Sequence, residues 1–572
     1  MRRPAFLAFL MLSIGFSAGL MVPAVDSNMQ GVLVNLTCEL VPGHGRVLVT
    51  TDPYIGVGTQ ESERTATAVA KTLVGNFSDK DVIFIFSAAN TGTIDGGSAG
   101  MAMAVCLMSE INNDTISPGV SITGGIDSAG RVMQVAGILQ KAKAVSQFAR
   151  VFLIPAGQSK TVTYAKEFVN PREGIYIEEA RPVEIDIAEY AAENWNLSIV
   201  EFTNISQAYD WMTKNITARP PFQFAIPKFT RNLTRVNELA DMSVARAQKL
   251  VNGIDANDSI ALDYLNKAAK VGSDFPYTRA NYAFLAAVAS QTSLENVDSV
   301  ANEMSKQLQK FETSDPYWRA ETELRLSWAL FKDNSFIAKK DWLLIAANMF
   351  ALERTGNRTL DIGQVKKLAN QKILEAKEAV EQAKIVAGES RSAEEALTLA
   401  VKSYDADMYF AALYNALDAI AWADASKGAS RAYLQSVFSS PKTDEFSEAY
   451  RRHAIYLLTH SGGDPSLIET AIFSARRADL REGVFGDMKN LPISFSLPAI
   501  DWKLLLILVL GAYTARNVLG KRKKGRAELT EKDMIMLAES KARAVKFLQE
   551  KLKDKEITRE TYVKLVRELE GL

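Results

Sequence analysis

A serine on a glycine-rich turn and a lysine 43 residues after it are the residues of this chain that could carry out covalent chemistry. The serine is Ser98, in the stretch Asp95-Gly96-Gly97-Ser98-Ala99-Gly100, and the lysine is Lys141. A serine hydroxyl is a weak nucleophile until a base removes its proton, and a lysine can be that base when burial lowers its pKa. Backbone N–H groups in such a turn can hold an oxyanion. The pair therefore predicts nucleophilic acyl transfer.

Histidine, the usual base in such chemistry, is scarce in this chain. Its three histidines are His44, His453 and His460, and only His44 lies in the same N-terminal block as Ser98. A Ser-His-Asp triad is therefore not expected. Lys141 follows the apolar stretch 135–140, which favours its burial at the entry to a helix. The alternative interpretation of so short a motif is a serine in a tight turn and a solvated helical lysine.

The segment around these residues resembles the proteolytic domain of the Lon family of Ser-Lys peptidases. The resemblance covers roughly residues 30–215, about a third of the chain, and both the order of the motifs and the Ser-to-Lys spacing match the family pattern. The motifs are Val41-Pro42-Gly43-His44-Gly45-Arg46, Gln60-Glu61-Ser62, the stretch from Asp95 to Gly100, Ile122-Thr123-Gly124-Gly125-Ile126, Gly130-Arg131-Val132, the stretch from Val135 to Lys141, and Phe152-Leu153-Ile154-Pro155.

The resemblance implies a role for five residues. Ser98 would be the nucleophile and Lys141 the general base. Asp95 would shape the catalytic loop, and Thr123 would lie near the lysine. The backbone amides of Gly97 and Ser98 would be the oxyanion donors. The sequence departs from the family pattern at Gly97, where proline is common, and at residues 136–140, where Gly-Gly-Leu-Lys-Glu is common.

Lon proteases carry an ATPase module ahead of the peptidase, and here only a targeting segment precedes it. The sequence contains no Gly-x-x-x-x-Gly-Lys-Ser/Thr phosphate-binding loop. We therefore expect an ATP-independent serine endopeptidase that cleaves unfolded or flexible polypeptides and binds no nucleotide. Two alternatives stay open. One is a non-degradative scaffold or signalling membrane protein whose helical ectodomain binds partners, and the other is an enzyme that cleaves only itself.

The composition limits the cofactors and partners. With 66 Lys and Arg against 67 Asp and Glu, the charge gives no reason to expect a nucleic-acid partner. No His and Cys residues have metal-ligand spacing, so we expect no metal and no cofactor. Cys38 and Cys106 could pair, but the interpretation as two small buried apolar residues is favoured. The family resemblance implies a homo-oligomeric ring.

The ends of the chain predict a protein anchored in the cell membrane. Residues 1–24 have the arginines and apolar run of a signal peptide or N-terminal anchor. Residues 500–519 are predicted to be a transmembrane helix, because a basic cluster follows the apolar run and marks the cytoplasmic side. The bulk of the chain would be extracellular and residues 520–572 a charged helical cytoplasmic tail. Nine candidate glycosylation sites support export: Asn35, Asn76, Asn113, Asn196, Asn204, Asn215, Asn232, Asn257 and Asn357.

The predicted fold class is an α+β Lon-like domain over residues 25–217, a linker over 218–231, and an all-α domain over 232–490 that could be solenoid-like, followed by the membrane helix and tail. Strands are expected at 34–41, 46–51, 81–86, 120–123 and 151–154, and helices at 60–74, 99–111 and 204–212. The all-α domain contains aromatic-rich helix stripes at 277–284 and 404–414. Such stripes favour a helix core, and the alternative is a groove that presents peptide.

Overall fold

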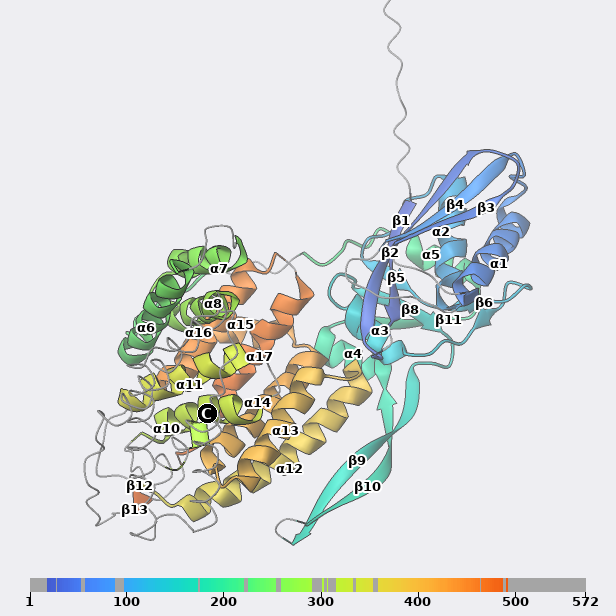
Figure 1. Ribbon diagram of the computed structural model, residues 1–572. Coiled ribbons are helices and arrows are strands. Elements are labelled where there is room, and N and C mark those ends of the chain that lie inside the picture. The colour runs from blue at the N-terminus through green and yellow to red at the C-terminus, as the bar shows by residue number, and fades with distance from the viewer. Residues whose placement is uncertain are drawn as a thin grey trace, which may run out of the picture. The chain divides into compact units, whose positions relative to one another are not determined.

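The structure, a computed structural model, shows a mixed α/β region followed by a helical region (Figure 1). It describes residues 18–491 except 27, 53–56, 88–96, 173–174, 221–224, 254–258, 291–300, 303–305, 307–314, 333–335, 353–358, 463 and 487–489. The described residues all belong to one compact unit, which ends at Ile493. The change from mixed to helical elements falls at the predicted linker, yet both regions belong to this unit.

A four-stranded sheet in the order β1-β2-β4-β3 forms the N-terminal part of the core. Its strands are β1 (Ala18–Val25), β2 (Gly31–Pro42), β3 (Val47–Asp52) and β4 (Lys80–Ser87). β2 pairs antiparallel with β1 and β4, whereas β3 pairs parallel with β4. Parallel neighbours need a crossover connection, which helix α1 (Val57–Val74) supplies. On β2, Val34 and Leu36 are buried and Asn35 between them is exposed, because successive side chains of a strand face opposite sides.

A second, parallel sheet in the order β11-β8-β5 completes the mixed region. Its strands are β5 (Val120–Ile122), β8 (Val151–Pro155) and β11 (Ser198–Phe202). Besides α1, the described α-helices of this region are α2 (Gly100–Asn112), α3 (Ile138–Val145), α4 (Ile187–Trp195) and α5 (Ile205–Met212). Two antiparallel pairs accompany them: β6 (Gly125–Ile126) with β7 (Val132–Met133), and β9 (Lys160–Arg172) with β10 (Ile175–Asp186). Most of α2 is buried, and it contacts β1, β2, α1 and α5.

The helical region packs around one central helix, α14 (Tyr409–Lys427), which contacts α10, α12, α13 and α17. Its side chains are buried on nearly all sides, which is expected of a helix that is apolar all round. The other described helices are α6 (Thr234–Val251), α7 (Ser259–Lys270), α8 (Pro276–Ala289), α10 (Pro316–Phe331), α11 (Phe336–Ala351), α12 (Ile362–Ala387), α13 (Arg391–Asp405), α15 (Arg431–Ser439), α16 (Glu445–His460) and α17 (Pro465–Arg481). A short pair, β12 (Thr359–Leu360) with β13 (Asn490–Leu491), is added to them.

Polar residues at the helix starts explain where several of these helices begin. Each accepts a hydrogen bond from a backbone N–H of the first turn, which would otherwise lack a partner. In α10 and α17 a proline follows the cap and sets the first helical residue. The capping residues are Asp315, Asp361, Ser430, Asp444 and Asp464.

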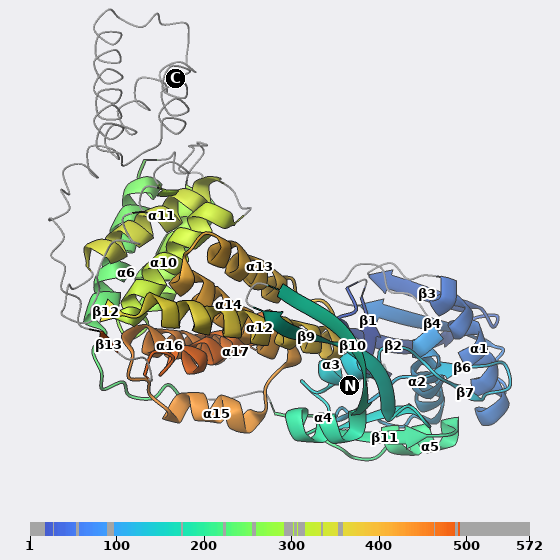
Figure 2. The same cartoon turned by 90° about the horizontal axis from the view of Figure 1, so that it is seen from below.

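The solenoid-like arrangement considered for the helical region is wrong. In a solenoid each helix pair contacts only its neighbours along the chain. Here, among the described helices, α10 packs on α14 and α6 contacts α16, although both pairs are far apart in sequence. Figures 1 and 2 also show the β9–β10 ribbon beside α12, and β9 contacts that helix. The aromatic stripe at 404–414 is core as predicted, since Phe410 and Tyr414 are buried.

The predicted fold class also needs a correction at the C-terminus. Within the part of the chain that the structure describes, no helix is both long enough and apolar enough to cross a membrane. The fold is therefore a mixed α/β region followed by helices, and the C-terminal transmembrane helix is not supported. The predicted span at 500–519 and the predicted tail at 520–572 lie outside the described residues.

The mixed region begins earlier in the chain than the predicted residue 25. The predicted signal segment ends at residue 24, yet Ala18–Val25 form β1, which pairs with β2 along its length. Leu20 and Val22 are only 4% and 3% exposed. An apolar strand and the apolar run of a signal peptide have similar compositions, so the sequence did not separate them. The region begins at Ala18 or earlier, and residues 1–17 lie outside the described residues.

A chain that starts at Val25 should be markedly less stable than one that starts at Ala18. Without β1, the buried contacts of Leu20 and Val22 are lost and one edge of β2 is unpaired. Loss of these two apolar side chains alone corresponds to about 3–6 kcal/mol of unfolding free energy. Urea unfolding of the two shortened chains measures the difference, and equal midpoints would show that β1 is not part of the core.

Cys38 on β2 and Cys106 on α2 are both fully buried and form a disulfide. The favoured interpretation of two separate buried cysteines is therefore wrong about their pairing and right about their burial. The bond joins the first sheet to the helix that follows Ser98.

Reduction of this disulfide should destabilise the mixed region. Cys38 and Cys106 are 68 residues apart, so the bond removes much of the freedom of the unfolded chain. We expect Cys38→Ala/Cys106→Ala to lower the free energy of unfolding by about 2–4 kcal/mol. These are the only two cysteines of the chain, so dithiothreitol should lower the urea midpoint of the wild type and leave the double variant unchanged. A wild-type urea midpoint that does not change with dithiothreitol would contradict the Cys38–Cys106 disulfide.

Candidate active site

Ser98 lies in a single 3₁₀ turn, Gly97–Ala99, that leads directly into α2. Its side chain is partly exposed, while the helix behind it is buried. Gly100 is needed at the first turn, because a Cβ there would lie 2.8 Å from Cγ2 of Ile126. The prediction that Ser98 lies near a helix N-terminus is thus confirmed. The partial positive charge at that end of a helix favours a developing oxyanion.

Lys141 lies on the short helix α3. The residue before this helix, Gly137, has a left-handed backbone conformation with φ of 72°. The Lys141 side chain is 3% exposed. Burial lowers the pKa of Lys141 from 10.5 to about 8. A lysine with such a pKa is partly neutral near physiological pH, and only the neutral amine can accept a proton.

Thr123 connects the two candidate residues. It follows β5 and is fully buried, with its backbone N–H donating to the carbonyl of Leu153 on β8 at 3.0 Å. The Lys141 Nζ donates to Thr123 Oγ1 at 3.3 Å. The Thr123 hydroxyl in turn donates to the carbonyl oxygen of Ser98 at 3.3 Å. The same carbonyl accepts a hydrogen bond from Gly124 N–H at 2.9 Å, which fixes the turn that carries Ser98.

The structure therefore brings Ser98, Thr123 and Lys141 together from three elements: the turn before α2, the end of β5, and α3. Gly97 is exposed beside them, and the oxyanion role of the Gly97 and Ser98 amides stays a prediction. Asp95 lies outside the described residues.

Sequence reasoning missed the support that the helical region gives to α3. Gln140, next to Lys141, donates from Nε2 to the carbonyl of Ile385 on α12 at 2.8 Å. Val386 packs in one apolar cluster with Ile138 and Leu139 of α3. No sequence motif signals this contact, because Gln140 and Ile385 are 245 residues apart.

Thr123→Val should impair the site without removing a reacting group. The change keeps the shape of the side chain but removes the hydroxyl between Lys141 and Ser98, and we expect kcat/KM to fall about 10–100-fold. The charged amine also loses a hydrogen-bond acceptor, so its pKa should fall and the pH–rate profile should move to lower pH. Thr123→Ser is the matched control and should keep the wild-type kcat/KM and the wild-type pH–rate profile. An unshifted profile in Thr123→Val would contradict the contact.

Of the nine candidate glycosylation sites, seven lie among the described residues and all seven are exposed. Exposure is necessary for glycan attachment, but it is ordinary for asparagine, so glycosylation stays a prediction. Asn257 and Asn357 lie outside the described residues. The exposed sites are Asn35, Asn76, Asn113, Asn196, Asn204, Asn215 and Asn232.

Comparison with known families agrees with this geometry. Residues 12–178 match the Lon protease (S16) C-terminal proteolytic domain. The chain contains a Lon-type peptidase domain. Ser98, Thr123 and Lys141 all lie within the matched residues. The match also begins inside the predicted signal segment, as expected if β1 belongs to the Lon-type domain.

The relatives are similar to only part of this chain. An archaeal Lon protease of Thermoplasma acidophilum is 28% identical over 157 residues, which cover 26% of this chain and 22% of that protein. An archaeal Lon protease of Methanothermobacter thermautotrophicus is 25% identical over 161 residues, covering 27% and 24%. A Lon protease of Fervidobacterium nodosum is 30% identical over 119 residues, covering 20% and 14%. The chain thus spans less than a quarter of the length of these relatives.

Proposed function

We propose that this chain is a serine endopeptidase in which Ser98 is the nucleophile and Lys141 the general base. One observation carries the proposal: the Lys141 amine is buried and bonded to Thr123, which is itself bonded to the Ser98 carbonyl. A lysine placed there by chance would keep its amine in water, since burial of a charge is costly. The match to a proteolytic domain supports the same chemistry.

In the proposed reaction, neutral Lys141 accepts the proton of the Ser98 hydroxyl while Oγ bonds to the carbonyl carbon of the substrate. The oxyanion that forms is held by the amides of Gly97 and Ser98 at the start of α2. The carbon–nitrogen bond then breaks and the leaving amine takes the proton from Lys141. Water attacks the acyl-enzyme, giving a proton to Lys141, which returns it to Ser98 Oγ as the acid product leaves.

The proposed substrate is a flexible or unfolded polypeptide, and the proposed reaction uses no nucleotide. The absence of a phosphate-binding loop from the sequence supports nucleotide independence. Cleavage of unfolded casein by the purified full chain, with and without ATP and Mg²⁺, tests both statements. We expect equal rates in the two conditions. No cleavage, or cleavage only with ATP, would overturn the proposal.

The proposed place of action is outside the cell membrane. The Cys38–Cys106 disulfide supports this, because disulfides persist mainly in oxidising compartments. The exposed asparagines of the candidate glycosylation sites are consistent with it. Protease added to intact cells should degrade the chain, whereas protection until the cells are lysed would contradict the proposal.

A further inference from the structure

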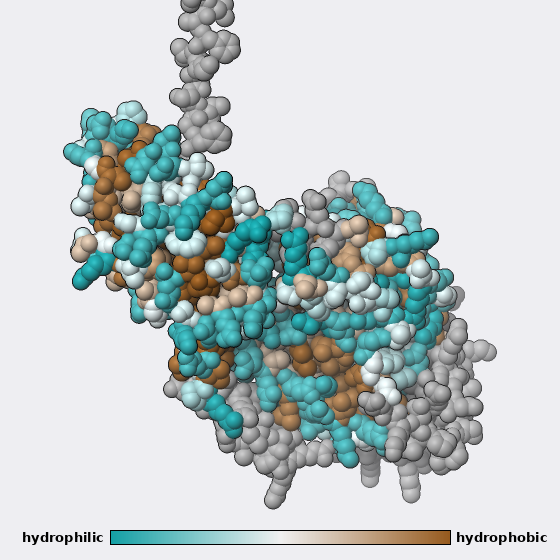
Figure 3. All heavy atoms as spheres, turned by 180° about the vertical axis from the view of Figure 1, so that it is seen from behind, coloured by the Kyte–Doolittle hydropathy of each residue, from teal (hydrophilic) through white to brown (hydrophobic). Residues whose placement is uncertain are grey.

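The helical region contains a cavity of about 380 Å³, which is in the usual size range of small-ligand sites. The surface offers no comparable apolar site among the described residues, because its large exposed apolar side chains are spread over several elements. On the face shown in Figure 3, the hydrophobic patches lie among hydrophilic side chains. The cavity lies among α6, α8, α10, α11, α13, α14, α16 and α17, each of which contributes lining residues. It is separate from Ser98, Thr123 and Lys141, none of which lines it.

Aromatic rings make up much of the cavity wall. Trp422 and Phe473 stack with ring centroids 4.0 Å apart, and Phe284 stacks on Trp342 at 5.7 Å. Trp328 packs edge-on against Trp342 at 5.8 Å. Such a wall favours an apolar or aromatic group in the ligand. The stripe at 277–284, which the sequence assigned to the core or to a groove, therefore contributes to a cavity.

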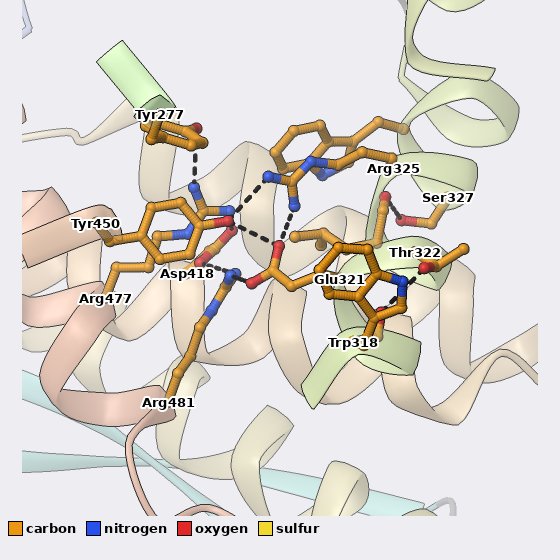
Figure 4. Close-up of polar contacts among 12 residues, drawn as sticks. Tyr277, Trp318, Glu321, Thr322, Arg325, Ser327, Asp418, Tyr450, Arg477 and Arg481 are labelled. Atoms are coloured by element: carbon orange, nitrogen blue, oxygen red, sulfur yellow. Dashed lines mark hydrogen bonds and ion pairs between the residues drawn. The ribbon is translucent and has the colours of Figure 1, made fainter. Parts of the chain in front are cut away.

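A buried ionic network forms another part of the wall (Figure 4). Asp418 accepts hydrogen bonds from Arg477 at 2.7 Å and from Arg481 at 2.6 Å. Arg481 and Arg325 both pair with Glu321. Tyr450 accepts from Arg325 at 2.8 Å and donates to Glu321 at 2.7 Å. Of these residues, Arg325, Arg477 and Asp418 line the cavity.

The network has more positive than negative groups. Three guanidinium groups face two carboxylates, and each of these five side chains is at most 7% exposed. Burial opposes ionisation of Glu321, but the nearby arginines hold its pKa at about 2. Asp418 is bonded to two guanidinium groups. Asp444 caps α16 and does not line the cavity. Glu395 and Lys332 do line it, and they pair with each other at 3.8 Å, so they leave the charge balance of the wall unchanged.

The donors of Arg477 are not all used. Its Nε–H is buried and has no hydrogen-bond partner within the described structure. Its remaining contact, with the Tyr277 hydroxyl, is long at 3.4 Å. The guanidinium carbon of Arg477 also lies 4.3 Å from the ring centroid of Tyr450 and 5.3 Å from that of Phe473, and these contacts offset part of the cost of burying its charge. The surplus positive charge beside the cavity favours an anionic group in a ligand bound there. The planar guanidinium fork matches a carboxylate.

We propose that this cavity binds a carboxylate that carries an aromatic or bulky apolar group, with the carboxylate directed to Arg325 and Arg477 and the apolar group among the aromatic rings. Two sources share this chemistry: the C-terminal end of a peptide, and a free hydrophobic carboxylic acid. The site does not depend on the proposed peptidase reaction. It would recognise the charge at one end of the ligand and the apolar surface at the other.

The test uses the full chain with Ser98→Ala, so that peptide probes are not cleaved, and isothermal titration calorimetry. The probes are N-acetyl-L-phenylalanine, its neutral amide, and a hexapeptide ending in phenylalanine with a free or an amidated C-terminus. We expect each free carboxylate to bind at least about ten-fold more tightly than its amide. Equal affinity of acid and amide, or no binding of any probe up to about 10 mM, would overturn the proposal.

Two variants on α6 locate the binding. Ser243 lines the cavity, so Ser243→Trp should fill it and abolish binding. Met242, the adjacent exposed residue, does not line it, so Met242→Trp is the matched control and should bind as before. Binding that survives Ser243→Trp would place the ligand elsewhere and overturn the site. If Ser243→Trp fails to fold, the comparison of the affinities of each free carboxylate and its amide still tests the proposal.

The same titrations separate the two sources. If the hexapeptide with a free C-terminus binds at least as tightly as N-acetyl-L-phenylalanine, the site accepts the end of a peptide chain. If only N-acetyl-L-phenylalanine binds, the cavity is closed to a chain and takes a free acid. Either result supports the carboxylate site, because both depend on the free carboxylate.

Discussion

Ser98→Ala should reduce peptidase activity by about 10⁴-fold or more, because it removes the atom that bonds to the substrate. Stability should change little, by less than about 1 kcal/mol, since the side chain is partly exposed at the start of α2 and fills no core position. Initial rates on fluorescein-labelled casein measure the first effect. Urea unfolding followed by circular dichroism measures the second.

Ser109→Ala is the matched control for this variant. Ser109 lies near the other end of α2 and is fully buried, with its hydroxyl donating to the carbonyl of Asp114. Its loss should cost about 1 kcal/mol of stability and leave the rate unchanged. The two serines should thus give opposite patterns. Activity that persists in Ser98→Ala at more than trace level would remove Ser98 from the reaction.

Lys141→Met should strongly reduce activity and at the same time stabilise the protein. The variant loses the general base, which lowers the rate about 10²–10⁴-fold or more. It also loses a buried amine whose pKa is lowered from 10.5 to about 8 by burial, a difference that corresponds to about 3 kcal/mol against folding at neutral pH. After loss of the hydrogen bond to Thr123, we expect a net gain of about 1–3 kcal/mol.

The pH dependence gives this prediction its sign. Between about pH 8 and pH 10.5 the unfolded chain holds the Lys141 proton and the folded protein does not, so the wild type gains stability as pH rises through this range. Below about pH 8 both states are protonated and the burial cost is fully present. Lys141→Met should lack this rise. The wild-type kcat/KM should likewise increase with pH up to about 8 and then level off, because the neutral amine is the base.

Lys143→Met is the control on the same helix. Lys143 is two residues beyond Lys141, partly exposed and on another side of α3, so its loss should leave the pH–rate profile unchanged. A loss of stability in Lys141→Met, with activity retained, would mean that Lys141 is a structural residue.

The elements around the site could largely be predicted from local patterns. Strands β2, β3, β4, β5 and β8 and helices α1, α2 and α5 lie within a few residues of their expected bounds, because their apolar periodicity and turn residues are clear. The proximity of Ser98, Thr123 and Lys141 followed from the family resemblance, since spacing along a chain does not by itself bring residues together. The hydrogen bonds through Thr123 could not be read from the sequence.

The misses have physical causes. β1 is apolar along its length and resembles a signal peptide, and only its pairing with β2 reveals a strand. The β9–β10 ribbon was overlooked although the sequence of residues 160–186 contains a usable signal, the turn-favouring residues Asn170, Pro171 and Gly174 between two β-prone stretches. The contacts around α14 and between Gln140 and Ile385 join distant segments, and a periodic pattern does not specify its partner.

Trapping of the acyl-enzyme tests the central claim most directly. A short peptide p-nitrophenyl ester is mixed with the full chain, quenched with acid, digested and analysed by mass spectrometry. We predict that the peptide containing Ser98 gains the mass of the acyl group in the wild type, and that this gain is absent from Ser98→Ala and strongly reduced in Lys141→Met. An acyl group on another residue, or equal labelling of Ser98 in Lys141→Met, would contradict a Ser98–Lys141 peptidase.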